Sequence, residues 1–148
     1  MTNIIVACLI RAGFRGTTPS ISHLVELSKS SQMKKALKTV QSALKLERPA
    51  EEVVEELGGQ TGAHEVVPMA VYHLYRTGFK FTQTLENGID TFHPSGIDMD
   101  SVLSIAGSIA GMRDVRGVEE SCWLDGLEDA EKIANEARAL VASTNRQA

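Results

Sequence analysis

The sequence has few of the residues that mark β-sheets, disulfide scaffolds and membrane spans. Aromatic residues make up 5% of the 148 residues, and no segment alternates apolar and polar residues between hairpin turns, which argues against strands. Cys8 and Cys122 are too few for a disulfide scaffold and have no metal-ligand spacing. The apolar run from Ile4 to Ile10 is too short to cross a bilayer and follows no basic segment. The sequence therefore predicts a soluble, cytoplasmic protein without a membrane partner.

The chain also lacks a block of basic residues. It has 15 Lys and Arg against 19 Asp and Glu, a net charge of −4, whereas a nucleic-acid interface requires clustered positive charge. The nearest candidate is a set of four lysines: Lys34, Lys35, Lys38 and Lys45. They alternate with an apolar stripe at helical spacing: Met33, Leu37, Val40 and Leu44. This pattern favours the solvated face of an amphipathic helix over a nucleic-acid interface.

Helical spacing of apolar residues is common along the chain. It predicts one all-α domain over residues 1–148. The expected helices cover residues 4–12, a segment from about 20, the lysine segment to about 46, 49–57, 67–77 with Pro68 in the first turn, 79–87, 101–112 and 127–141. The segment 87–98 is expected to be a loop.

Several side chains are expected to be buried. The segment 101–112 is apolar or small nearly all round, which implies burial on every side, with Gly107 and Gly111 admitting another backbone. Cys122 is expected to be a buried structural thiol and Trp123 a core residue. The last helix is expected to turn one stripe inward: Ala130, Ile133, Ala134, Ala137 and Leu140.

Two aspartates, Asp98 and Asp100, precede the small-residue helix, and Ser101 follows them. One aspartate at that place can cap the helix by accepting hydrogen bonds from free N–H groups. Two carboxylates and a hydroxyl are also the oxygen ligands that Mg²⁺ prefers. Spacing alone favours the cap over the metal site.

The histidines and the glycine loop 58–62 give weaker signals. His64 is expected to be a surface residue at a helix start, and His73 a core or boundary residue with a backbone partner. His93 lies in an ordinary turn sequence. No residue near His23 suggests a catalytic or binding role for it. The glycine loop could hold a phosphate on its backbone N–H groups, but helix termination is the better interpretation of its spacing.

Two longer segments resemble a known enzyme family. "GIDMDSVLSIAGSIAG" followed by "CWLDGLEDAEKIANEARAL" resembles the C-terminal part of the ADP-ribosylglycohydrolases, which release ADP-ribose from modified side chains. "GGQTGAHEVVPMAVYHLYRTG" is similar to the family's glycine loop and the helix after it. The resemblance is clearest over 58–141 and implies an orthogonal multi-helix bundle. It further suggests that the chain corresponds to the C-terminal half of that fold.

The resemblance also implies a site. Asp98, Asp100 and Ser101 fall on residues that bind metal in the family, whose pair of Mg²⁺ ions orients the ribose and a water. Loops near the ADP-ribose cleft correspond to four further positions, which become candidate ligand-binding residues: Gly59, Gly62, His64 and Gly96. The expected partner is ADP-ribose or an ADP-ribosylated protein.

The sequence departs from the family pattern in two ways. The family's Gly-Asp-Ala-Leu-Gly and Asp-Asp-Thr motifs do not occur, and Ile97 and Met99 replace a glycine and a threonine of the metal loop. We therefore expect a truncated hydrolase with an incomplete Mg²⁺ site, weakly active or inactive alone. Its other half would come from a complementary chain or a homo-oligomer. The alternatives are a non-catalytic remnant that binds ADP-ribose weakly or serves a structural role, and a helical interaction module.

Overall fold

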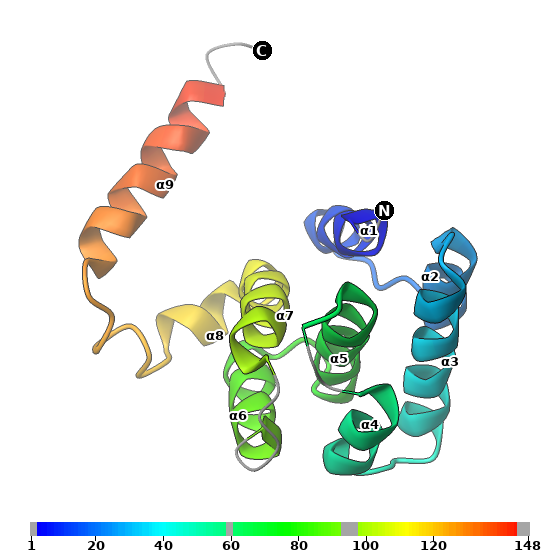
Figure 1. Ribbon diagram of the computed structural model, residues 1–148. Coiled ribbons are helices and arrows are strands. Elements are labelled where there is room, and N and C mark those ends of the chain that lie inside the picture. The colour runs from blue at the N-terminus through cyan, green and yellow to red at the C-terminus, as the bar shows by residue number, and fades with distance from the viewer. Residues whose placement is uncertain (1–2, 59–60, 93–97, 145–148) are drawn as a thin grey trace.

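A computed structural model describes residues 3–58, 61–92 and 98–144 of the protein. These residues form helices and no strand, which confirms the all-α prediction (Figure 1). The helices are α1 (Asn3–Phe14), α2 (Ile21–Leu27), α3 (Ser31–Lys45), α4 (Ala50–Leu57), α5 (Ala63–Arg76), α6 (Phe81–Phe92), α7 (Met99–Arg113), α8 (Val115–Glu119) and α9 (Ala130–Thr144).

Helix α5 is the centre of the bundle. Every residue from Val66 to Leu74 is buried, because α3 and α7 pack on opposite parts of its surface and α4 and α6 add smaller contacts. The Tyr72 hydroxyl reaches out of this core and donates a hydrogen bond to the carbonyl of Arg48, 2.7 Å away. A helix that is apolar nearly all round is stable only when it is surrounded in this way.

Helix α3 confirms the amphipathic interpretation of the lysine segment. Met33, Leu37 and Val40 are buried against the core, and the four lysines are exposed. The helix begins where Ser30 accepts a hydrogen bond from the N–H of Met33, a regular N-cap.

Two boundaries differ from the prediction. Helix α6 continues to Phe92, so the loop expected over 87–98 is wrong for its first six residues. A Cβ placed on Gly88 would lie 2.3 Å from Cδ2 of Leu103, so the glycine allows α6 and α7 to approach closely, and this contact offsets its low helix propensity. Pro68 lies in the second turn of α5 rather than the first, because the helix begins at Ala63.

Helix α7 is buried on one side only. Val102, Ala106 and Ile109 are buried, whereas Ser104 and Ser108 are exposed, so the expected burial on every side is wrong. The serines are small enough to resemble core residues in the sequence but stay in contact with water.

The two glycines of α7 accommodate side chains and not a backbone. A Cβ on Gly107 would lie 3.1 Å from Leu85, and one on Gly111 would lie 3.4 Å from Phe81, both of α6. The interpretation of these glycines as a backbone contact is therefore wrong, although the close approach itself is present.

The segment after α7 contains a short helix that the sequence did not reveal. Asp114 begins α8 by accepting a hydrogen bond from the N–H of Gly117 at 3.3 Å. The same carboxylate accepts one from the N–H of Phe81 at 3.0 Å. Asp114 thus ties the start of α6 to the end of α7.

Helix α9 stands clear of the bundle (Figure 1). Ile133 is 51% exposed and Leu140 is 67% exposed, so the expectation that this stripe faces inward is wrong. Trp123 is 42% exposed and Cys122 is also exposed, so neither is the core residue that we predicted. The turns between α8 and α9 lead the chain away from the bundle, and these side chains reach no core. No described helix is both long and apolar enough to cross a membrane.

Candidate metal centre

The predicted metal residues lie at the start of α7. Asp98 is the N-cap, and its Oδ1 accepts a hydrogen bond from the N–H of Ser101 at 3.2 Å. The cap that spacing favoured is therefore present. It uses one oxygen of the carboxylate, so a capping role and a metal-binding role are compatible for Asp98.

Asp100 and Ser101 occupy the first turn of α7. Asp100 is exposed, and Asp98 and Ser101 are half-buried, so all three can be reached from solvent. The positive end of the helix dipole is equivalent to about half an elementary charge. It stabilises carboxylates at this place and repels a cation. The two negative charges outweigh that repulsion, and the all-oxygen donor set fits Mg²⁺ in kind.

These three donor groups are too few for a complete metal site. Within residues 3–58, 61–92 and 98–144, no three His, Cys, Asp or Glu side chains are grouped as a metal would require. Two carboxylates and one hydroxyl from a single loop can hold one side of a cation. The remaining ligands would have to be water, substrate or carboxylates from elsewhere.

The described glycines of the loop 58–62 help to begin and end helices. Gly58 ends α4 with a left-handed backbone at φ 93°, a conformation that glycine adopts at little cost. The N–H of Gly62 donates to Oε2 of Glu65 at 3.1 Å and so starts α5. Helix termination, the interpretation that spacing favoured, is confirmed at Gly58. The candidate ligand residues Gly59 and Gly96, like His93, lie outside the described residues.

His64 is the remaining candidate of the ligand set. It lies in the first turn of α5 as predicted, and its Nε2 is 3.9 Å from Oε1 of Glu65. It borders a cavity of about 200 Å³ together with Ser28, Lys29 and Gln32. This cavity lies between the start of α5 and the turn from α2 to α3, and Asp98 is not among the residues that line it.

His73 is a core histidine, as expected, but its Nδ1 meets a side chain rather than the backbone partner that we predicted. It is fully buried in α5, and its Nδ1 lies 2.9 Å from Oδ1 of Asn87 on α6. Burial lowers the pKa of His73 to about 4, although the bond to Asn87 opposes the shift. The imidazole is therefore neutral at physiological pH and links α5 to α6.

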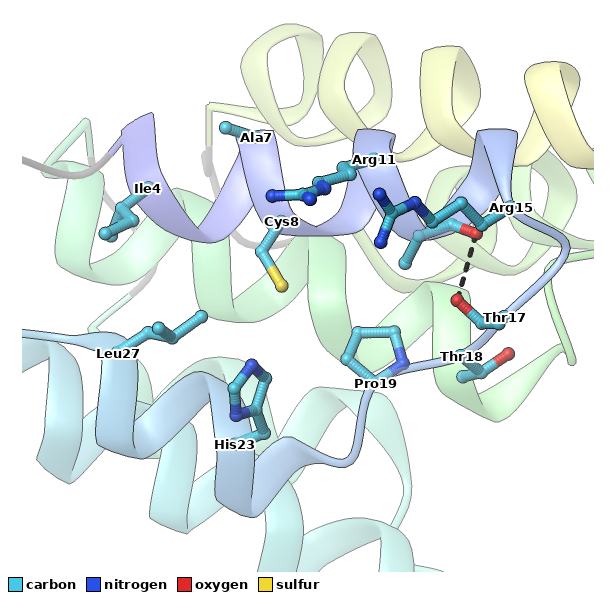
Figure 2. Close-up of a pocket in the computed structure, with 11 residues that line it drawn as sticks. Ile4, Ala7, Cys8, Arg11, Arg15, Thr17, Thr18, Pro19, His23 and Leu27 are labelled. Carbon is cyan, nitrogen blue, oxygen red and sulfur yellow. Dashed lines mark hydrogen bonds between the residues drawn. The ribbon is translucent and has the colours of Figure 1, made fainter.

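The structure also contains a groove that our sequence interpretation missed. It lies between α1 and α2 and has a volume of about 700 Å³. Figure 2 shows Cys8 and His23 on facing walls, with the guanidinium groups of Arg11 and Arg15 along one edge. The regular spacing of Ile4, Cys8, Arg11 and Arg15 was visible in the sequence, but the partner wall is set by the turn at Pro19.

Comparison with known proteins identifies the class of protein. The profile of the ADP-ribosylglycohydrolase family matches residues 1–148, beyond the segment 58–141 that carries the clearest motifs. The chain therefore belongs to the ADP-ribosylglycohydrolase family. No curated protein and no solved structure matches it.

Proposed function

We propose that this chain functions in the Mg²⁺-dependent hydrolysis of the N-glycosidic bond between ADP-ribose and a modified side chain. One observation supports this most directly. The only Asp-x-Asp-Ser segment of the chain begins α7, and the whole chain matches the family profile. The cytoplasm is the compartment that its two free thiols favour.

Asp98, Asp100 and Ser101 would hold one side of the metal site. A Mg²⁺ held by these residues would make a coordinated water more acidic and so a better nucleophile toward the anomeric carbon. Asp98 is already oriented by its bond to the N–H of Ser101, and the start of α7 presents all three oxygen-bearing side chains on a helix that is anchored in the core. A rigid support of this kind is what a metal site requires.

We further propose that these residues do not complete the site alone. The sequence contains no Asp-Asp pair, and the described residues offer no third carboxylate beside the first two. A site with so few charged ligands is expected to bind a divalent cation at about millimolar concentration. Full activity would then require carboxylates from outside residues 1–148, whether from a further segment of the protein, from a complementary chain or from a second copy.

The same observation favours a second candidate function. If no complementary carboxylates are supplied, the protein is a non-catalytic remnant that binds ADP-ribose weakly or serves a structural role. The two candidates differ in whether release of ADP-ribose from an ADP-ribosylated protein can be restored by adding a second polypeptide.

Titration of the isotope-labelled protein with Mg²⁺ tests the metal site. We expect the amide signals of residues 98–101 to move with a dissociation constant of about a millimolar. Asp98→Asn keeps the cap, because an amide oxygen also accepts the hydrogen bond, but it should weaken the titration. Asp100→Asn should weaken it as well, and Glu131→Gln on α9 is the exposed control.

Two results would contradict the proposal. If Mg²⁺ at about 10 mM moves no signal of residues 98–101, the segment is only a helix cap. If ADP-ribose with Mg²⁺ raises the melting temperature strongly, and Asp100→Ala abolishes that shift, the site is complete in this chain.

A further inference from the structure

The walls of the groove between α1 and α2 are mostly apolar, with His23 on the α2 wall. Ile4 and Cys8 lie on one face of α1, and Pro19 and Leu27 border the opposite wall (Figure 2). Ile4 and Cys8 are one turn of α1 apart, whereas Pro19 lies in the turn before α2 and Leu27 ends that helix, so the groove runs between α1 and the segment 17–27. Ile4 is 42% exposed although it belongs to a helix with almost no polar residues. A groove of this form is the kind that accepts the apolar face of another helix.

The edge of the groove is positively charged. Arg11 and Arg15 are exposed, and neither forms an ion pair with another described residue. The only carboxylate of α1 and α2 is that of Glu26, which does not line the groove, so no lining carboxylate balances the two guanidinium groups. The occupant that fits best therefore combines an apolar stripe with negative charge beside it.

Helix α9 and the segment directly before it have these two properties together. Ile133, Ala137 and Leu140 form a stripe at i, i+4 and i+7 that the bundle leaves exposed. Glu136 lies beside this stripe on α9, and Asp129 directly precedes the helix, with a left-handed backbone at φ 59°. Within α9, Glu131 and Glu136 are matched by Lys132 and Arg138, and the excess of negative charge lies just before the helix, at Asp125, Glu128 and Asp129. The 15 residues of α9 are enough to cover the 12 residues of α1.

We propose that α9 of one copy docks in the α1–α2 groove of a second copy, with Ile133 and Leu140 on the apolar walls and Asp129 and Glu136 beside Arg11 and Arg15. Helix α9 stands clear of its own bundle (Figure 1), so its stripe is available to a partner. Each copy presents one groove and one α9, so a reciprocal exchange closes as a two-fold dimer. The dimer covers both apolar surfaces, which monomeric proteins rarely expose together.

Sedimentation equilibrium of the full chain over a range of concentrations tests the dimer. We expect Ile133→Ser/Leu140→Ser to raise the dimer dissociation constant by on the order of a hundredfold, because both anchors are apolar. The helix content of the variant should stay the same, since both side chains are exposed in the monomer. Leu46→Ser, at an exposed apolar position outside both surfaces, is the matched control and should leave the dimer intact.

A charge exchange tests which surfaces meet. Arg11→Glu/Arg15→Glu and Asp129→Arg/Glu136→Arg should each weaken self-association by on the order of tenfold. In a mixture of the two variants, the wild-type α9 of one copy meets the wild-type groove of the other, and the reversed α9 meets the reversed groove. Both contacts then join opposite charges, so a heterodimer should form in preference to either homodimer. This result would support the proposal.

Other outcomes overturn the proposal. A wild-type chain that stays monomeric at all concentrations shows that α9 covers its own groove, or that another molecule occupies the groove. A dimer that survives either charge reversal uses different surfaces. Loss of the dimer in the arginine variant alone shows that the groove holds some segment other than α9.

Discussion

Helices α3 and α9 have the same length and a similar apolar stripe, yet the stripe of α3 is buried in the bundle and that of α9 is exposed to solvent. Each has 15 residues. Leu37 and Val40 of α3 are fully buried, whereas Ile133 and Leu140 of α9 are 51% and 67% exposed. The difference lies in what surrounds them: α3 packs on α2, α4 and α5, and α9 stands clear of all of them (Figure 1).

The comparison shows that an apolar stripe specifies a helix but not its partner. The free energy gained from burial scales with the apolar area removed from water, so the stripe of α3 contributes to the stability of the isolated chain and that of α9 does not. We therefore expect the stability of the monomer to depend on the contacts among α3, α5, α6 and α7. Helix α9 should be nearly independent of them.

The largest effect expected is that of truncating a core leucine. Leu37→Ala should lower the free energy of unfolding by about 2–5 kcal/mol, because it leaves a cavity in a fully packed site. Leu140→Ala, the matched change in α9, should alter it by less than about 0.5 kcal/mol. Urea unfolding at low protein concentration measures both, and equal losses would show that α9 is part of the core.

A pH titration tests the link between α5 and α6. The pKa of His73 is about 4 in the folded protein, against an ordinary value of 6.5. The unfolded chain therefore binds a proton at His73 between these values and the folded protein does not. Stability should be full above about pH 6.5 and fall by about 3 kcal/mol as the pH drops toward 4.

The controls separate His73 from the other histidines. His73→Gln should remove this part of the pH dependence, whereas His23→Gln, at an exposed position of α2, should retain it. If His73→Gln leaves the slope of stability against pH unchanged between pH 4 and 6.5, the buried imidazole is not its source.

The smallest expected effect is the change in stability when glycine is replaced by alanine, compared between a packed and an unpacked position. Gly88→Ala places a Cβ 2.3 Å from Leu103, and we expect a net loss of about 1 kcal/mol, since overpacking exceeds the gain in helix propensity. Gly126→Ala, between α8 and α9, meets nothing within 4 Å and should be neutral or slightly stabilising. Thermal unfolding measures both changes, and a stabilising Gly88→Ala would show that Leu103 moves aside freely.

Much of the fold could be predicted from local sequence. The helices over α3 and α4, the cap at Asp98 and the solvated lysine face all depend on residues within a few positions of each other. The continuation of α6 through Gly88 could not be predicted in this way, because it depends on Leu103 of the next helix. The exposure of Trp123 was missed for the same reason, since an aromatic residue is buried only if a core lies within its reach.

The candidate functional residues also fall into a group that the sequence predicted and a group that it did not. Asp98, Asp100 and Ser101 were found from one short segment, and the cap that orients Asp98 was among the alternatives. The groove between α1 and α2 was not found, because its two walls are brought together by a turn and carry no motif.

By itself, the sequence determined that the protein is all-α, where most of its helices begin, and which oxygen-bearing side chains precede the small-residue helix. Spacing and capping are local interactions, so they can be recognised from neighbouring residues. Only the tertiary structure decided which apolar stripes are buried, that α6 passes through Gly88, and that α9 leaves the bundle. Burial depends on surfaces that meet from distant parts of the chain, and no local pattern contains that information.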